Sequence, residues 1–136
     1  MGQQQLLIII LGTIIVGIAV AFGITMFIDS SVSANRDAVC NDLISLAARA
    51  QEFYRRPASL NGGGNSFDLL TTDAIALLTN QPKNGNGSYF IETPGTGTGS
   101  NAVVVIKGIG TELNNGSSVA VHVFVYPGRD SIVTIN

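Results

Sequence analysis

The sequence predicts an α+β fold, in which a long N-terminal α-helix packs under a small four-stranded antiparallel β-sheet. Three observations lead to this prediction. Residues 1–28 contain no Asp, Glu, Lys or Arg and are mostly apolar. Apolar residues then recur every three or four positions as far as Tyr54, which is the period of one helical face. Beyond residue 87, four runs rich in β-branched residues are separated by turn residues.

Residues 1–28 are predicted to form the hydrophobic half of the helix and to anchor the chain in a membrane. As a helix, the stretch from Leu6 to Ile28 would span about 35 Å, enough to cross the hydrocarbon core of a bilayer. A cleavable secretory signal is disfavoured because no basic residue precedes the run and no small-residue cleavage site ends it.

Three glycines interrupt this apolar run, at Gly12, Gly17 and Gly23. Each weakens a helix by about 1 kcal/mol relative to alanine. Small residues let neighbouring helices approach closely in an apolar medium. The three glycines are therefore candidate assembly positions.

Residues 29–56 are predicted to continue the same helix as its amphipathic half. No Pro or Gly separates the two halves. The predicted buried stripe consists of Val32, Val39, Leu43, Leu46, Ala47, Ala50 and Phe53 or Tyr54. Pro57 and the following "NGGGN" are expected to end a helix that is about 80 Å long.

Residues 57–136 are predicted to form a globular head. The run "TTDAIALLTN" predicts a short helix near residues 73–79, with Thr71 or Thr72 as its N-cap. Strand-like runs follow at residues 88–93, 101–109, 118–126 and 130–136. The separators are short and rich in Gly, Pro and Asn, so an antiparallel meander is the simplest topology.

The third strand-like run, "SVAVHVFVY", alternates strictly between two faces. One face carries the valines at positions 119, 121, 123 and 125, and the other carries Ala120, His122, Phe124 and Tyr126. One apolar face of the sheet must pack on the amphipathic half of the helix, because no other element is long enough to cover it. The second apolar face indicates a contact with another subunit or a covering loop.

Composition and charge disfavour several classes of function. Charged residues make up 12% of the 136-residue chain and the net charge is -2, so we expect no nucleic-acid partner, which would need a basic patch. The only cysteine, Cys40, cannot form an internal disulfide and is interpreted as a small buried hydrophobe. The only histidine, His122, has no Cys, Asp or Glu at ligand spacing nearby in the sequence. We expect no enzymatic activity, no metal and no cofactor.

The predicted helix contains the stretches "MGQQQLLIIILGTIIVGIAVAFG" and "NRDAVCNDLISLAARAQEFYRRP". These stretches, followed by a small antiparallel sheet, resemble the type IV pilin and pseudopilin family. The resemblance implies a precursor in the inner membrane, whose basic leader a prepilin peptidase removes and whose new terminal amine is methylated. It also implies that an inner-membrane assembly machinery moves the subunit into an extracellular filament, in which residues 1–28 form the core.

The family commonly has glutamate as the fifth mature residue, where it pairs with a neighbour's terminal amine. If Met1 is the mature N-terminus, which we favour, Gln5 stands in that place. A cut after Gly2 would instead make Leu7 the fifth residue, and the two-residue leader would lack a basic residue. Gln5 could accept a hydrogen bond through its amide oxygen, as a weaker and uncharged latch. Met1 and Gln5 therefore join the candidate assembly residues.

The function implied by the resemblance is that of a structural subunit, the major pilin, of an extracellular type IV pilus-like filament. Its partners would be identical copies of itself in a helical homopolymer. Two alternatives remain open: a pseudopilin of a secretion system, and a monomeric membrane-anchored binding module. Adhesion, motility and DNA uptake would all use the same subunit plan.

Two N-x-S sequons make Asn86 and Asn115 candidates for glycosylation. Each asparagine is followed by glycine, which turn chemistry alone also requires. We favour the turn interpretation at both positions.

Overall fold

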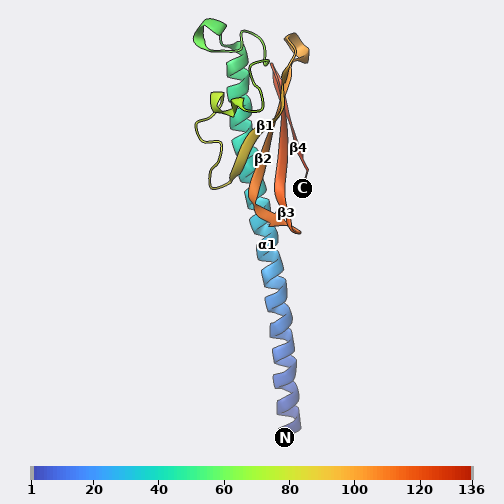
Figure 1. Ribbon diagram of the computed structural model, residues 1–136. Coiled ribbons are helices and arrows are strands. Elements are labelled where there is room, and N and C mark those ends of the chain that lie inside the picture. The colour runs from blue at the N-terminus through green and yellow to red at the C-terminus, as the bar shows by residue number, and fades with distance from the viewer. Residues whose placement is uncertain (1, 136) are drawn as a thin grey trace.

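The protein consists of a long helical rod with a small head at one end (Figure 1). The computed structural model describes residues 2–135. Helix α1 (Gly2–Arg55) is uninterrupted over 54 residues. Strands β1 (Gly87–Thr96), β2 (Val103–Asn114), β3 (Ser117–Tyr126) and β4 (Arg129–Thr134) lie beside its C-terminal half. The predicted α+β fold is confirmed.

The four strands form an antiparallel meander in the order β1-β2-β3-β4. Asn115 and Gly116 join β2 to β3 in a two-residue turn, with φ values of 49° and 84°. Positive φ at both positions is typical of a type I′ turn, whose twist matches that of the paired strands. The Asn-Gly pair at this place is thus explained by backbone geometry.

The core lies between the sheet and one face of α1. All residues of the predicted stripe are buried, including both Phe53 and Tyr54. The valines of β3 are completely buried against them, whereas the alternate residues of β3 are half-buried on the far side of the sheet. The amphipathic pattern and the strand alternation therefore predicted the core correctly.

The predicted short helix at residues 73–79 is wrong in type and length. The structure has a single 3-10 turn there, η2 (Ala74–Leu77), whose N-cap residue Asp73 makes no side-chain capping hydrogen bond. Thr71 contributes its backbone carbonyl, which accepts from the Ala74 N–H at 2.9 Å. So short a segment cannot nucleate an α-helix in isolation, and Leu78, directly after the turn, is buried in the core. Two further 3-10 turns, η1 (Ala58–Leu60) and η3 (Gly99–Asn101), lie in the loops.

Strands β1 and β2 are longer than the sequence pattern predicted. β1 continues through Pro94 as far as Thr96, which pairs with Val103. The register of this pair is irregular between Ile91 and Thr96, and proline is tolerated at such irregular positions because its missing N–H interrupts no regular ladder. The end of the predicted fourth strand, Asn136, lies outside the described residues.

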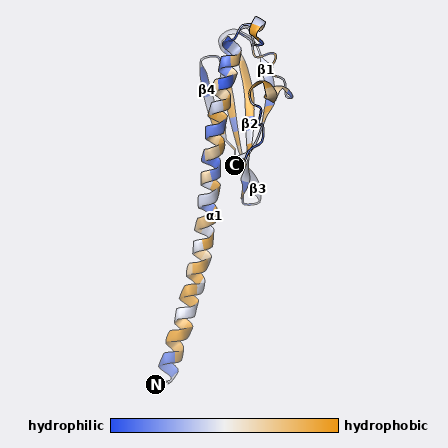
Figure 2. Ribbon diagram, turned by 90° about the vertical axis from the view of Figure 1, so that its left-hand side faces the viewer, coloured by the Kyte–Doolittle hydropathy of each residue, from blue (hydrophilic) through white to orange (hydrophobic). Residues whose placement is uncertain are grey.

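The N-terminal half of α1 projects from the head as a free apolar rod, orange along most of its length in Figure 2. The helix is long and apolar enough to cross a membrane, and the subunit buries none of its most apolar stretch. The hydroxyls of Thr13 and Thr25 donate to the carbonyls of Ile10 and Phe22, so both are satisfied within the helix. Exposed apolar surface of this extent must be covered by lipid or by protein.

Candidate functional site

The candidate assembly surface is the exposed apolar half of α1, from Leu6 to Ile28. Its large side chains are exposed all round the helix, with Leu7 at 65%, Phe22 at 66% and Phe27 at 75%. The first charged side chain, Asp29, follows immediately. A surface that is apolar on every side suits complete burial among other helices or in lipid.

Nothing inside the subunit requires glycine at Gly12, Gly17 or Gly23. Apart from the adjacent backbone of the helix itself, a Cβ atom added at any of these positions would meet no atom of residues 2–135 within 4 Å. Since each glycine also weakens the helix by about 1 kcal/mol, the explanation for them lies outside the subunit. Gly12 and Gly23 project about 20° apart around the helix, whereas Gly17 is about 140° from Gly12. Neighbouring helices can therefore approach α1 closely from two sides.

The N-terminal end of this surface carries Gln5, the residue predicted to hydrogen-bond to a neighbouring subunit. Gln5 is exposed in the first turns of α1, where backbone N–H groups lack intrahelical partners. No acidic residue lies in the first turn. The candidate Met1 lies outside the described residues.

The carboxylate of Asp42 joins helix α1 to the head. Its Oδ2 accepts hydrogen bonds from Tyr89 Oη at 2.5 Å, Asn84 Nδ2 at 2.8 Å and Asn86 Nδ2 at 2.9 Å. Burial alone would raise the pKa of Asp42, but the bonds from Tyr89, Asn86 and Asn84 outweigh it and lower that pKa. Burial, together with the bond to Asp42, raises the pKa of the Tyr89 hydroxyl. Sequence reasoning missed this cluster because Asp42 is more than 40 positions away from its three donors.

The two sequon asparagines have different surroundings. Asn86 donates through Nδ2 to Asp42, and its carbonyl accepts from Asn35 Nδ2 at 2.8 Å. It is thus part of the contact between helix and head, with its amide nitrogen already engaged. Asn115 is exposed at the β2–β3 turn.

A cluster of three polar side chains lies on the far side of the sheet from α1. Glu92 on β1 accepts from Lys107 Nζ at 3.1 Å and from His122 Nδ1 at 2.9 Å. No acidic residue stands near His122 in the sequence, and strand pairing brings Glu92 to it from 30 positions away. The Nε2 atom of His122 is buried, without a hydrogen-bond partner among the described residues. Within residues 2–135, no group of three or more His, Cys, Asp or Glu could hold a metal ion.

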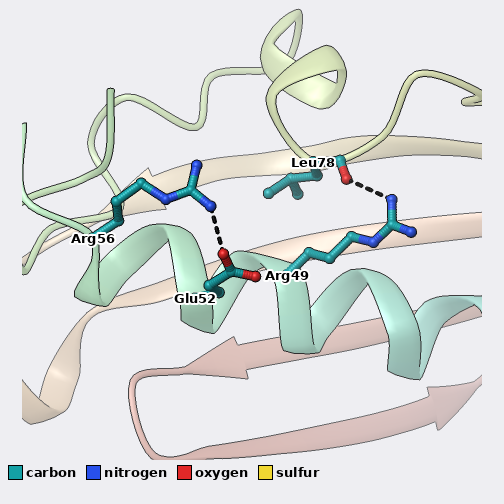
Figure 3. Close-up of polar contacts among 4 residues, drawn as sticks. All are labelled: Arg49, Glu52, Arg56 and Leu78. Carbon is teal, nitrogen blue, oxygen red and sulfur yellow. Dashed lines mark hydrogen bonds and ion pairs between the residues drawn. The ribbon is translucent and has the colours of Figure 1, made fainter. Parts of the chain in front are cut away.

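Hydrogen bonds at the upper end of α1 attach it to the loops of the head (Figure 3). Arg49 donates to the carbonyl of Leu78 at 3.0 Å, and Arg56 pairs with Glu52 one turn earlier in the helix. On the opposite side, Gln51 donates to the carbonyl of Tyr126 at 3.1 Å. The contacts of Arg49 and Gln51 hold the head against the C-terminal half of the rod, whereas the Arg56–Glu52 pair is local to the end of the helix.

Cys40 is half-buried and packs against the core, in agreement with its interpretation as a small hydrophobe. Burial and the nearby Asp37 raise the pKa of its thiol, and Arg36 opposes them. A raised pKa favours the unreactive thiol form.

Comparison with models of known protein families, with curated proteins and with solved structures returned no match. The function must therefore be argued from the geometry of the chain itself.

Proposed function

We propose that this protein is the structural subunit of an extracellular type IV pilus-like filament, which polymerises through the exposed apolar half of α1. The observation that carries the proposal is the combination of an all-round apolar helix with three glycines beside which, among the described residues, the subunit leaves open space. A lone membrane anchor needs apolar surface but has no use for glycines on two sides. A core of many packed helices needs both.

In this proposal the apolar half of α1 is covered first by lipid and then by other helices. Before assembly, residues 6–28 are covered by the lipid of the inner membrane, where a prepilin peptidase and the assembly machinery would act. After assembly, the helices of identical copies replace the lipid. This exchange is favourable only if the helices pack closely, since lipid tails are as apolar as the side chains themselves.

Gln5 has a defined part in this proposal. If Met1 is the mature N-terminus, the Gln5 amide oxygen accepts a hydrogen bond from a neighbour's terminal amine. An amide is less costly to desolvate in the filament core than a carboxylate. The contact between subunits is then made by packing and hydrogen bonding, with no ion pair at this position.

The test is assembly of the full chain carrying Gly17→Leu, with Val16→Leu as the matched control on the same exposed helix. Electron microscopy of shed filaments should show that Gly17→Leu abolishes them and that Val16→Leu does not. Membrane insertion and the urea-unfolding midpoint of the head in detergent should be unchanged in both variants, because Gly17 touches nothing in the subunit. Normal filaments from Gly17→Leu would contradict the proposal.

The outcome also separates the two alternative functions. A monomeric membrane-anchored binding module predicts no filaments from the wild-type chain and a monomer in detergent. A pseudopilin predicts no long surface filament of this chain alone, even on overexpression. Long filaments that contain only this chain would exclude both.

A further inference from the structure

The β2–β3 turn is the part of the head nearest to the apolar half of α1 (Figure 1), and the view in Figure 2 agrees. Its level along the helix is fixed by Asn35. The Asn35 amide donates to Thr111 Oγ1 at 3.3 Å, and its Oδ1 accepts from the backbone N–H of Glu112 at 3.3 Å. Glu112 therefore lies beside Asn35, and the chain continues from there toward the N-terminal end of the helix.

The length of the turn sets how far it extends. From Glu112 to Asn115 an extended chain advances about 10 Å, at roughly 3.4 Å per residue. The same length along α1 corresponds to about seven residues, at roughly 1.5 Å each. Seven residues before Asn35 along α1 is the level of Ile28 and Asp29, so the tip of the β2–β3 turn lies close to that level. Val32, although it lies beyond Asn35 in this direction, is still buried by the head.

A bilayer places its headgroups at this level. The hydrocarbon core is about 30 Å thick, and the headgroup regions increase the total to about 40–45 Å. Each headgroup layer is thus some 5–7 Å deep, which is the length of four or five helical residues. If residues 6–28 fill the hydrocarbon core, the layer covers residues 29–33, and the turn lies inside it.

The chemistry of the turn fits this layer. Residues 113–118 carry no charge, and Leu113 is 55% exposed although it belongs to a strand. The amide of Asn115 and the hydroxyls of Ser117 and Ser118 are also exposed. Neutral hydrogen-bonding groups around one apolar side chain match phosphate and ester oxygens that border hydrocarbon. The turn at the opposite end of the head is different, since it is followed by the charged pair Arg129 and Asp130.

We propose that, before assembly, the β2–β3 turn rests in the phospholipid headgroup layer and holds the head against the membrane at a second point. This inference depends on the membrane-anchored precursor of the proposed function. The contact limits the tilt of the head relative to α1 and the bilayer. It must be released when the subunit leaves the membrane.

Site-specific fluorescence quenching in phosphatidylcholine nanodiscs tests this contact. In a full chain with Cys40→Ala, single cysteines at Ser117→Cys, Gly128→Cys and Met26→Cys carry the same fluorophore. Ser117 reports the β2–β3 turn, Gly128 the β3–β4 turn at the other end of the head, and Met26 the hydrocarbon core. Ser117 and Gly128 are both exposed, so neither label needs room inside the fold.

Lipids with a nitroxide on the headgroup should quench most of the fluorescence at position 117 and little at position 128. Lipids with a nitroxide on the acyl chain should quench position 26. Equal and weak headgroup quenching at 117 and 128, with strong quenching at 26, would overturn the turn contact and leave the anchoring helix intact. Absence of quenching at all three positions would overturn both the contact and the membrane-anchored precursor.

Discussion

The hydroxyl of Tyr89 on β1 donates a hydrogen bond to Oδ2 of Asp42 on α1, at 2.5 Å. The same oxygen accepts from the amides of Asn84 and Asn86. A single carboxylate oxygen of the helix thus holds the first strand of the sheet and the loop before it. This contact positions the head at a fixed height along the rod.

Replacement of Asp42 by alanine should destabilise the head by about 2–3 kcal/mol, because it leaves the buried Tyr89 hydroxyl and the half-buried Asn86 amide without their charged acceptor. Urea unfolding of the full chain in detergent, followed by tyrosine fluorescence, measures the loss. Asp37→Ala is the matched control: Asp37 is exposed on the same helix, and such surface changes stay within about 0.5 kcal/mol. Equal midpoints for the two variants would show that the cluster contributes nothing.

Protonation of Asp42 should also make the stability of the folded head decrease at low pH. Its pKa is lower in the folded protein than the value near 3.9 expected for the unfolded chain. The stabilisation is therefore fully present above about pH 4 and is lost as the pH falls through the folded pKa. Urea midpoints of the wild-type chain should decrease more between pH 6 and pH 3 than those of Asp42→Asn. Parallel curves for the two proteins would be inconsistent with a lowered pKa.

Gly110 on β2 should be irreplaceable by alanine, because an added Cβ would lie 2.1 Å from Asn35 Oδ1 and 3.1 Å from Val119 Cβ. We expect Gly110→Ala to destabilise the head by about 1–3 kcal/mol, as other overpacked sites do. Gly128→Ala serves as control, since nothing lies within 4 Å of its added Cβ. Adding Asn35→Ala to Gly110→Ala should restore part of the loss by removing the clashing atom. No difference between the two glycine variants would contradict the close approach of β2 to α1.

Filaments of the wild-type chain should resist salt, because a neutral Gln5 makes no ion pair that salt could screen. Sedimentation of sheared filaments at low and at high sodium chloride measures the polymerised fraction. Gln5→Glu should add salt dependence by introducing a carboxylate beside the neighbour's terminal amine. Wild-type filaments that dissolve in salt would show that charge, rather than packing, holds the subunits together.

Local patterns in the sequence predicted the helix, the stripe that it buries and the four strands. A period of 3.6 marks the helical face that ends at Phe53 and Tyr54, and the alternating valines of β3 mark the buried face of the sheet. These features depend only on neighbours in the chain, so a sequence displays them directly. The glycines at positions 12, 17 and 23 were also visible without any structure.

Only the tertiary structure decided which polar groups meet. Asp42 and Tyr89 are 47 positions apart, and Glu92 and His122 become neighbours through two strand pairings. The structure likewise has a 3-10 turn, followed by the buried Leu78, where a short helix was predicted. Such contacts depend on strand register and on the level at which the sheet lies along α1, and no local periodicity encodes either. The same level brings the β2–β3 turn closest, of all parts of the head, to the apolar half of α1 (Figure 1).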